Sequence, residues 1–540
     1  MPGSASFRFR WRVCGLVLCV LLPSSLLTAK ATAQGVNILT FHGNEARLGW
    51  NAQETQLTPS TVNSHSFGKL WETPLDGQIY GSPLHVSDLE IGGKKRDVVF
   101  TATENNSVYA LDASTGQILW GPKTLAPSLN ETQYNDCNNI HPRHGITSTP
   151  VIDLEKQTIY VCGVTQPGIR QVYQVWGLDL LTGDVRPGWP VTLKGRYQGC
   201  DFDAGQLTQR GALNLINGWL YIPFGSRCDI GEWHGWIMGV NTGDPSALQR
   251  AFTPAPTIEG GGIWGSAGVS ADQDGNLYAV TGNGGYNLDK GGHNVCESVL
   301  RLTPDGDGLK MSDYYVPANW KDLDAADVDM GGSSAIVLPD QPDTSTPHLV
   351  VTCGKDGLIY MVNRDKLGQV GGEVYKQRLF GDPNVSYHSN IKTTPAYFDG
   401  GEAGRFVYAT GNETGPNGEA GVVALKVVTD GSPNGKSRLQ TAWTLKQELH
   451  QPGAPTVSSN GSKEAILWVI ESNKDDGDLG PPGVLHAFDA ITGKTLYRSD
   501  EDPTRDTLED ARKFSCPTVA NGRVFVGTHG IVAYGLLHGK

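Results

Sequence analysis

The stretch Val108–Trp120 reads V-Y-A-L-D-A-S-T-G-Q-I-L-W, and it decides the fold. Apolar residues alternate with others on both sides of a central D-A-S-T-G, as they do along β-strands. Asp112 can accept hydrogen bonds from backbone N–H groups of the turn, and Gly116 can adopt the positive φ that closes it. The stretch therefore predicts a β-hairpin with an Asp-x-x-Thr-Gly turn and a large ring, Trp120, on its outer strand.

A single hairpin cannot bury its own apolar face, so the unit is expected to recur. Two close copies are Trp176–Trp189, W-G-L-D-L-L-T-G-D-V-R-P-G-W, and His486–Tyr497, H-A-F-D-A-I-T-G-K-T-L-Y. Weaker copies are Met238–Gly243 and Tyr360–Gly368. Such repetition in a chain of 540 residues, with 69 Gly and 31 Pro, predicts a β-repeat architecture that can use the whole length in one domain.

Eight repeats can be counted from two recurrent features. Each repeat opens with two small residues, or a small residue and Pro, which suit crowded strands near a central axis. These opening pairs are Ser82-Pro83, Thr149-Pro150, Gly211-Ala212, Ser266-Ala267, Ser333-Ser334, Thr394-Pro395, Ala454-Pro455 and Cys516-Pro517. A second strand, usually rich in Val, Tyr and Thr, follows each pair. These second strands are Val98–Thr103, Thr158–Val164, Trp219–Phe224, Asn276–Thr281, His348–Cys353, Phe406–Thr410, Ala465–Ile470 and Arg523–Thr528.

The two ends of the repeat array complement each other. The last repeat has only about three strands before Lys540, whereas Phe67–Leu75 reads as a strand that belongs to no repeat. Pairing the two would close a ring and remove both open edges. We therefore expect an all-β fold, an eight-bladed β-propeller of four-stranded blades, in which 34–69 is an opening segment with the closing strand and 70–540 is the propeller. An open solenoid is the alternative, but its three-stranded end would stay unpaired.

Residues 1–33 have the pattern of a targeting segment. Arg8, Arg10 and Arg12 precede an apolar run, Val13–Leu27, and Ala31-Thr32-Ala33 matches a small-x-small cleavage site. The pattern predicts a Sec signal peptide cleaved after Ala33 and a secreted or periplasmic protein. No later stretch has the length and apolar character of a membrane span.

The charge and the cysteines bound the possible partners. Removing residues 1–33 takes away four cations and no acid, so the net charge of −13 becomes −17, which disfavours nucleic acid. Nine Cys fall to seven, and export permits disulfides. Cys200 and Cys228 both flank the third repeat, and we expect them to form a disulfide. The sequence holds no C-x-x-C-H, which argues against covalent haem attachment.

One face of the expected propeller carries long, chemically rich segments. Links between blades share a face with the turns between second and third strands, and we call it the loop-rich face. The long segments there are Asn135–Gly145, Gly195–Gly211, Thr257–Gly265, Asn319–Gly331, Gly381–Thr394 and Asp500–Phe514. Short Thr-Gly turns occupy the opposite face. Because loops on a rigid scaffold carry function, we expect any site on the loop-rich face.

With these features, the chain resembles the pyrroloquinoline quinone (PQQ) propellers, the quinoprotein alcohol dehydrogenases and their secreted relatives. The resemblance spans nearly all of the chain after residue 33. It includes the A-x-D-x-x-T-G-x-x-x-W unit, which non-catalytic propellers share, and an opening H-G-N-x-x-R at His42–Arg47 followed by L-T-P-S-T-V and G-K-L-W. Gln209–Leu213 and His234–Met238 resemble segments of a large group of secreted bacterial propellers.

Particular residues match motifs that have roles in that family. Ile263-Trp264-Gly265 and Ala279–Asn283 resemble a W-G…G-T-G-N blade, which implies that Trp264 forms the floor under the quinone and Asn283 is a metal ligand. Asp327-Val328-Asp329 resembles the segment that supplies the catalytic Asp, and either carboxylate could also bind the metal. Lys355 stands in K-D-G-L-I-Y, which resembles the motif whose Lys contacts the quinone oxygens.

The sequence also departs from the family pattern. The adjacent Cys pair found in many of these dehydrogenases is missing, and Cys137 stands alone near the matching loop. The Glu metal ligand has no clean equivalent, although Asp229 and Glu232 lie in about the right turn. The cofactor carboxylates could be bound by three further residues. These are Arg143, His144 and Arg210.

Elementary chemistry makes this set coherent. A flat quinone suits an aromatic floor, Ca²⁺ suits hard oxygen ligands, a carboxylate can take a hydroxyl proton, and a cation stabilises the reduced ring. Each residue taken singly also fits a structural role, as a packed ring, a turn carboxylate or a hairpin lysine. Two classes of function stay open. One is a monomeric exported dehydrogenase that uses PQQ and Ca²⁺ on an alcohol or sugar and passes electrons to a separate carrier. The other is a non-catalytic propeller that binds a protein or glycan on its loop-rich face.

Overall fold

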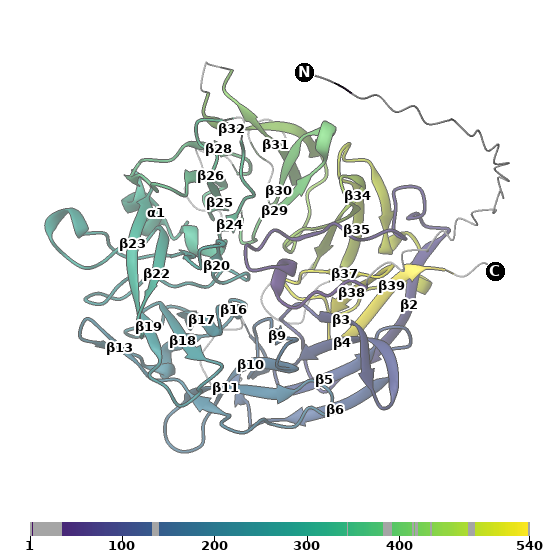
Figure 1. Ribbon diagram of the computed structural model, residues 1–540, viewed down its shortest axis with the longest axis horizontal. Helices are drawn as coiled ribbons and strands as arrows, with labels where there is room; N and C mark the ends of the chain where they lie inside the picture. The colour runs from purple at the N-terminus through teal and green to yellow at the C-terminus, as the bar shows by residue number, and fades with distance from the viewer. Residues whose placement is uncertain are drawn as a thin grey trace. The chain divides into compact units, whose positions relative to one another are not determined.

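The computed structural model describes residues 3, 35–131, 140–342, 344–381, 391–412, 415, 420–431, 435–472 and 481–537. The expected signal peptide, apart from Gly3, and Cys137 lie outside the described residues. Contacts divide the chain into two units, Met1–Gln34 and Gly35–Lys540. The second unit contains eight antiparallel sheets arranged as blades around a common axis (Figure 1). The expected eight-bladed β-propeller is confirmed.

Each blade has four strands, ordered from the axis outward, and the first four blades follow in chain order. Blade 1 comprises β3 (Leu84–Ile91), β4 (Lys94–Ala102), β5 (Ser107–Asp112) and β6 (Ile118–Thr124). Blade 2 comprises β9 (Val151–Asp153), β10 (Thr158–Thr165), β11 (Val172–Asp179) and β12 (Val191–Thr192). Blade 3 comprises β16 (Asn214–Ile216), β17 (Trp219–Ser226), β18 (Trp236–Asn241) and β19 (Arg250–Phe252), with β15 (Leu207–Thr208) beside β17. Blade 4 comprises β20 (Ser270–Ala271), β21 (Leu277–Val280), β22 (Val299–Asp305) and β23 (Gly308–Val316), with β27 (Gln369–Val370) beside β23.

The other four blades repeat the plan. Blade 5 comprises β24 (Ile336–Val337), β25 (Leu349–Cys353), β26 (Leu358–Asn363) and β28 (Tyr375–Arg378). Blade 6 comprises β29 (Ala396–Asp399), β30 (Arg405–Thr410), β31 (Ala420–Thr429) and β32 (Ser437–Leu445). Blade 7 comprises β33 (Thr456–Asn460), β34 (Lys463–Glu471), β35 (Val484–Asp489) and β36 (Thr495–Arg498), with β1 (Trp50–Asn51) beside β33. Blade 8 comprises β37 (Thr518–Ala520), β38 (Arg523–Gly527), β39 (Gly530–Leu536) and β2 (Phe67–Pro74).

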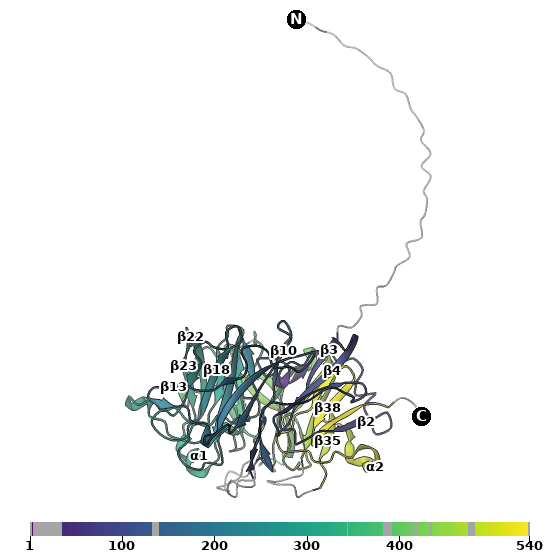
Figure 2. The same ribbon diagram turned by 90° about the horizontal axis from the view of Figure 1, so that it is seen from below.

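The remaining elements are short and lie in the links. They are the hairpins β7 (Leu129–Asn130) with β8 (Arg143–His144) and β13 (Arg196–Tyr197) with β14 (Cys200–Asp201), the helices α1 (Trp320–Ala326) and α2 (Pro503–Asp506), and the 3₁₀ turns η1 (Phe41–Gly43), η3 (Ala204–Gln206), η4 (Leu288–Lys290), η5 (Met330–Gly332), η6 (Gly401–Ala403) and η7 (Ser499–Glu501). In the side view of Figure 2, α1 and α2 lie on the same face of the ring. Among the described residues, no helix has the length and apolar character needed to cross a membrane.

The predicted hairpin forms between β5 and β6. Asp112 Oδ1 accepts the N–H groups of Ser114 and Thr115 at 2.9 and 3.2 Å, and Gly116 has φ 73°. A β-carbon on Gly116 would lie 2.5 Å from a ring carbon of Trp71 on the neighbouring blade. The glycine therefore serves both the turn and the close approach of blade 8, which precedes blade 1 in the ring.

Tryptophans on the outer strands bridge consecutive blades through these turns. Trp120 Nε1 donates to Leu180 O at 3.1 Å, Trp71 to Ala113 O at 3.3 Å and Trp443 to Ala490 O at 3.0 Å. Each bond joins an outer strand to the Thr-Gly turn of the following blade, which explains why Trp and Thr-Gly occur in the same repeat.

The ring closes through the first strand of the propeller. β2 pairs antiparallel with β39, from Phe67 opposite Leu536 to Pro74 opposite Gly530, with a bulge between Lys69 and Trp71. Trp71 then contacts blade 1 as described above, so this single strand completes blade 8 and also packs against the first blade. The closing strand expected at Phe67–Leu75 is thus confirmed within one residue.

Gly35–Glu54, which we call the axial segment, crosses the inner strands at the ends remote from the loop-rich face (purple in Figure 1). Its backbone carbonyls accept N–H groups of inner-strand residues in five blades. These are Ile152, Ala271, Val337, Tyr397 and Val457, at 2.8–3.0 Å. It reaches the other three blades through Ile38 paired with His85, Arg47 donating to Leu213 O, and Asn51 donating to Val519 O. The segment therefore contacts every blade.

Candidate functional site

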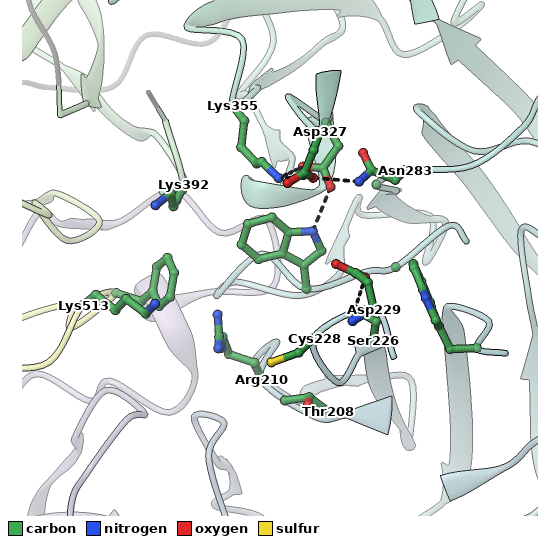
Figure 3. Close-up of a pocket in the computed structure, with 16 residues that line it drawn as sticks. Thr208, Arg210, Ser226, Cys228, Asp229, Asn283, Asp327, Lys355, Lys392 and Lys513 are labelled. Carbon is green, nitrogen blue, oxygen red and sulfur yellow. Dashed lines mark hydrogen bonds and ion pairs between the residues drawn. The ribbon is translucent and has the colours of Figure 1, made fainter. Parts of the chain in front are cut away.

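A cavity of about 370 Å³ opens on the loop-rich face. Its walls come from the links before blades 3, 4, 5, 6 and 8 and from the second-to-third strand turns of blades 3, 4 and 5. The lining residues are Thr208, Arg210, Ser226, Cys228, Asp229, Trp233, Gly262, Trp264, Gly282, Asn283, Asp327, Asp329, Lys355, Lys392, Lys513 and Phe514 (Figure 3). The volume lies at the lower end of the range of about 300–1,000 Å³ typical of small-molecule sites.

Trp264 is seated among glycines. A β-carbon on Gly331 would lie 2.9 Å from Trp264 Nε1 and 2.7 Å from Gly282 N, and one on Gly332 would lie 3.0 Å from the ring. A side chain at either position would displace the indole or the backbone. The link that follows Asp329, M-G-G, therefore fixes where the aromatic surface lies.

A charged cluster lies at one edge of this ring. Asp327 Oδ1 accepts a hydrogen bond from Asn283 Nδ2 at 2.7 Å. The same oxygen forms an ion pair with Lys355 Nζ, also at 2.7 Å. Asp329 Oδ2 accepts Trp264 Nε1 at 3.3 Å, and its Oδ1 lies 3.6 Å from Lys355 Nζ. Lys355 Nζ also lies 5.6 Å from the centre of the Trp264 ring, within cation–π reach. The two carboxylates, the amide and the ammonium thus form one network (Figure 3).

The two carboxylates differ in environment. The Asp327 side chain is 45% exposed, whereas that of Asp329 is 5% exposed. Burial raises the pKa of Asp329; the Lys355 ammonium opposes this shift and the Asp327 charge adds to it. Asp327 is thus the carboxylate that a ligand in the cavity could reach, and Asp329 is an internal group bonded to the floor.

A second group of cations and an aromatic ring line the opposite side. Lys392 and Lys513 lie across the cavity from Asn283 in Figure 3. The Arg210 guanidinium lies 4.6 Å from the Phe514 ring centre, and Phe514 meets Trp264 edge-on with ring centres 6.4 Å apart. The cavity therefore has an aromatic corner.

Four residues that line the cavity have positive φ, as do others elsewhere, such as His42 and Arg47. Cys228, Asp229, Asp327 and Phe514 have φ of 56°, 53°, 52° and 73°. Positive φ is mild for Asp but is a true outlier for a ring as large as Phe. Such strain persists where the surroundings fix a residue for a functional reason.

Comparisons with solved structures bear on this arrangement. The chain is similar to a quinohemoprotein alcohol dehydrogenase from Pseudomonas putida HK5, with a TM-score of 0.60 and 12% identity over 93% of this chain and 80% of that chain. It is also similar to the quinohemoprotein alcohol dehydrogenase from Comamonas testosteroni, with a TM-score of 0.59 and 14% identity over 94% and 82%. No protein-family model and no curated protein sequence matches the chain. The chain thus shares the propeller fold of these two dehydrogenases. At this identity the likeness extends to the fold alone.

Within this propeller, the cavity gathers most of the residues singled out from the sequence. It is lined by seven of them, namely Arg210, Asp229, Trp264, Asn283, Asp327, Asp329 and Lys355. Asp229 is exposed and accepts a hydrogen bond from Ser226 Oγ at 2.5 Å, rather than joining the Asp327 cluster. Lys392, Lys513 and Phe514 were not anticipated. Each stands a few residues before the opening pair of a blade, as Arg210 and Trp264 do, and this shared position was the available signal.

Three of the expected residues do not line the cavity. Arg143 donates to Ser128 Oγ and Ser128 O at 3.0 and 2.8 Å. His144 is buried, with Nδ1 2.7 Å from Glu131 Oε1, and burial lowers its pKa. Glu232 is exposed on the turn after β17. His144 and Glu131 instead line a separate cavity of about 30 Å³ that shares Arg210 with the main one.

The expected Cys200–Cys228 disulfide is wrong. Cys228 is disulfide-bonded, but Cys200 is a free thiol. Cys200 lies on the β13–β14 hairpin, whereas Cys228 lines the cavity in the turn after β17. Proximity to the same blade did not bring their side chains together. Cys162, Cys296, Cys353 and Cys516 are buried free thiols.

The described residues contain no group of three His, Cys, Asp or Glu side chains placed to hold a metal ion. The cavity nevertheless has oxygen atoms that make no hydrogen bond to the described part of the chain, although one of them, Asp329 Oδ1, lies 3.6 Å from Lys355 Nζ. Asn283 Oδ1 and Asp329 Oδ1 are both buried there without a hydrogen bond. Together with Asp327 they form a small set of hard oxygen donors, which is the ligand type that Ca²⁺ prefers.

Proposed function

We propose that the cavity binds PQQ together with a hard cation such as Ca²⁺, and that the protein is an exported quinoprotein dehydrogenase. Its substrate would be an alcohol or a sugar, and its electrons would pass to a separate carrier. One observation carries the proposal. The ring of Trp264 is bonded through Asp329 to a cluster in which Lys355 and Asn283 hold the reachable carboxylate of Asp327.

The cavity residues fit a flat, multiply carboxylated quinone. Trp264 supplies an aromatic surface, and its glycine surroundings leave the ring little freedom to move away. Phe514 supplies a wall at 76° to that surface. Three cationic side chains, Arg210, Lys392 and Lys513, line the same cavity and match carboxylates in charge.

A cation would depend on three side chains. Asn283, Asp327 and Asp329 offer oxygens, two of them buried and without hydrogen-bond partners among the described residues. Of the two further candidate ligands, Asp229 is bonded to Ser226 and Glu232 does not line the cavity. The fit therefore rests on fewer protein ligands than the six to eight oxygens that Ca²⁺ commonly takes, so cofactor or water oxygens would have to complete the set.

The residues of the chain then have separate tasks. PQQ, when bound, supplies the electron acceptor, and the cation supplies a Lewis acid. Asp327 is placed to take the proton of a substrate hydroxyl, because it is the exposed member of the cluster. Lys355 balances the carboxylates and contributes positive charge at the edge of the floor. Asn283 orients Asp327 through its amide N–H.

Export is part of the same proposal. The arginines and the apolar run within residues 1–33 support a Sec signal, with a mature protein that begins at Gln34. N-terminal sequencing of the protein recovered outside the cytoplasm would test this. A protein that retains residues 1–33 would contradict it.

Calorimetry with PQQ and Ca²⁺ tests the site. We expect Trp264→Ala to weaken PQQ binding by about tenfold or more, because it removes the stacking surface. Asp327→Asn should leave PQQ bound but lower dye reduction with a primary alcohol or sugar by about 10²- to 10⁴-fold, the usual contribution of a general base. Asp322→Asn, an exposed carboxylate on α1, is the matched control and should change neither quantity.

The alternative function predicts a different result. A propeller that binds a protein or glycan without catalysis would give no heat of binding with PQQ and Ca²⁺ at tens of micromolar protein, with its fold intact. The observation that favours this alternative is that Asp229 bonds to Ser226 and does not join the Asp327 cluster.

A further inference from the structure

Glu297 is an acidic side chain that is completely buried behind the candidate site. It lies between η4 and β22, does not line the cavity, and has 0% of its surface exposed. Its backbone has φ 49°, a left-handed conformation that is uncommon for Glu. Buried carboxyl groups are costly unless they are bonded, so this one requires an explanation.

Glu297 joins the two segments that carry the candidate ligands. Its backbone N–H donates to Gly282 O at 3.0 Å, next to Asn283. Its Oε2 accepts the N–H of Met330 at 3.0 Å, next to Asp329. Asn283 belongs to the turn of blade 4 and Asp329 to the link before blade 5, so one residue fastens both.

Glu297 shares the task of holding the segment around Asp329 with Lys355. Asp329 O accepts the N–H of Lys355 at 2.9 Å, so both polar groups of the peptide between Asp329 and Met330 are held, the carbonyl by Lys355 and the N–H by Glu297. Glu297 Oε1 is buried without a hydrogen bond to any described residue. Burial and the nearby Asp329 charge raise the pKa of Glu297. This agrees with a side chain whose role is to make a hydrogen bond and not an ion pair.

We propose that Glu297 is a positioning residue of the site, which fixes the Asp329 side chain against Trp264 by holding the peptide between Asp329 and Met330. The proposal rests on the proposed function for the roles of Asn283 and Asp329. The bond itself acts whether or not PQQ is the ligand. An acceptor atom is what the position needs, and a charge is not.

Two variants separate the acceptor from the charge. Glu297→Gln keeps an oxygen that can accept the Met330 N–H. Glu297→Met has a similar volume but no such acceptor, so it leaves a buried donor unpaired. Ser298→Ala is the matched control, because Ser298 is also buried and its hydroxyl bonds Val295 O and Thr281 Oγ1, both at 2.8 Å, rather than the Met330 N–H that Glu297 accepts.

Hydrogen exchange of the peptide covering 327–333, followed by mass spectrometry, is the first measurement. Exchange should be faster in Glu297→Met than in the wild type, and unchanged in Glu297→Gln and Ser298→Ala. Equal protection in all four proteins would overturn the proposal. This measurement requires no ligand, so it holds even where the proposed function fails.

The second measurement is calorimetry with PQQ and Ca²⁺. Glu297→Met should weaken binding by about tenfold, consistent with loss of a buried hydrogen bond, whereas Glu297→Gln should stay within about threefold of the wild type. If Glu297→Gln loses as much affinity as Glu297→Met, charge and not the acceptor is required, and the proposal is wrong. If Ser298→Ala has the same effect, the loss reflects general destabilisation and the proposal also fails. Absence of PQQ binding in the wild type would contradict the proposed function alone, leaving hydrogen exchange to decide the role of Glu297.

Discussion

At one end of the propeller axis the axial segment Gly35–Glu54 contacts all eight blades, whereas at the other end side chains from five links surround a cavity. Arg47, in the axial segment, has 0% exposure and donates to Thr40 Oγ1, Phe41 O, Leu213 O and Val269 O at 2.5–3.2 Å. Its charge is thus dispersed over neutral acceptors.

The cavity end differs in its buried oxygens. Asn283 Oδ1 and Asp329 Oδ1 have no hydrogen bond to the described residues, whereas the atom of the axial segment in that state is a ring nitrogen, His42 Nε2. Positive φ occurs at both ends, at Phe514 and at His42 and Arg47. Unsatisfied oxygen ligands beside a cavity are what a bound cation could complete. The contrast teaches that substitutions at the axial segment should act on stability, and substitutions at the cavity on binding.

Arg47→Ala gives the largest expected effect. It would leave the Phe41 carbonyl without a donor, remove one of the two donors to Leu213 O and Val269 O, and open a cavity beside the axis, so the free energy of unfolding should fall by about 3–5 kcal/mol. Denaturant unfolding followed by circular dichroism measures this. Arg196→Ala is the control, because the Arg196 side chain is 65% exposed and its ion pair with Asp201 should be worth less than about 1 kcal/mol. A loss at Arg47 as small as that of the control would remove the contrast between the two ends.

His42→Asn should reveal an acid sensitivity of the axial end. Burial lowers the pKa of His42 to about 3, against 6.5 for an unperturbed His, while its Nδ1 lies 3.1 Å from Arg47 O. Below pH 6.5 the unfolded chain takes up a proton that the folded protein refuses until about pH 3, so the stability of the wild type falls through that window. Asn tolerates the φ of 57° and has no such proton.

The comparison is made by denaturant unfolding at a series of pH values. The wild type should lose about 2–3 kcal/mol relative to His42→Asn between pH 6.5 and 4.5, and nothing further above pH 7.5. His85 is also buried, but it is present in both proteins and cancels from the difference. Parallel stability curves for the two proteins across this window would contradict the assignment.

Local and repeated signals made the fold predictable. Three signals depend only on residues that are neighbours in sequence: the D-x-x-T-G turn, the opening pairs and the unpaired strand Phe67–Leu75. A tryptophan equivalent to Trp120 recurs because each blade needs the same contact with the next blade. The axial segment gave no such signal. H-G-N-E-A-R matched the opening of the resembled family, but Arg47 bonds mainly to backbone carbonyls, which every sequence supplies, so the match did not show that it is buried at the axis.

Site residues that belong to a recurring blade motif could be predicted from the sequence. Residues that reach the cavity only because the ring closes could not. Trp264, Asn283, Asp327 and Lys355 come from consecutive blades, so their order along the chain already suggested that they converge. Phe514 reaches the same cavity from the link before the last blade, across the axis, and its position depends on a closed ring. Contrary to the prediction from the sequence, His144 does not line the main cavity. A loop histidine near the loop-rich face looks the same in the sequence whether it lines the cavity or pairs with a buried carboxylate such as Glu131.

Phe514→Gly gives the smallest expected change in stability and sharpens the contrast most. Glycine relieves a φ of 73°, a gain of about 1–3 kcal/mol, while the half-buried ring and its Arg210 contact are lost at a similar cost. The free energy of unfolding should therefore change by less than about 1 kcal/mol, yet PQQ affinity should weaken several-fold because the wall beside Trp264 is gone. Phe514→Leu keeps the strained backbone but loses the ring, so it should be less stable than Phe514→Gly and should bind PQQ as weakly. A Phe514→Gly protein that loses several kcal/mol, as Arg47→Ala is expected to, would mean that the cavity end serves stability in the same way as the axial segment.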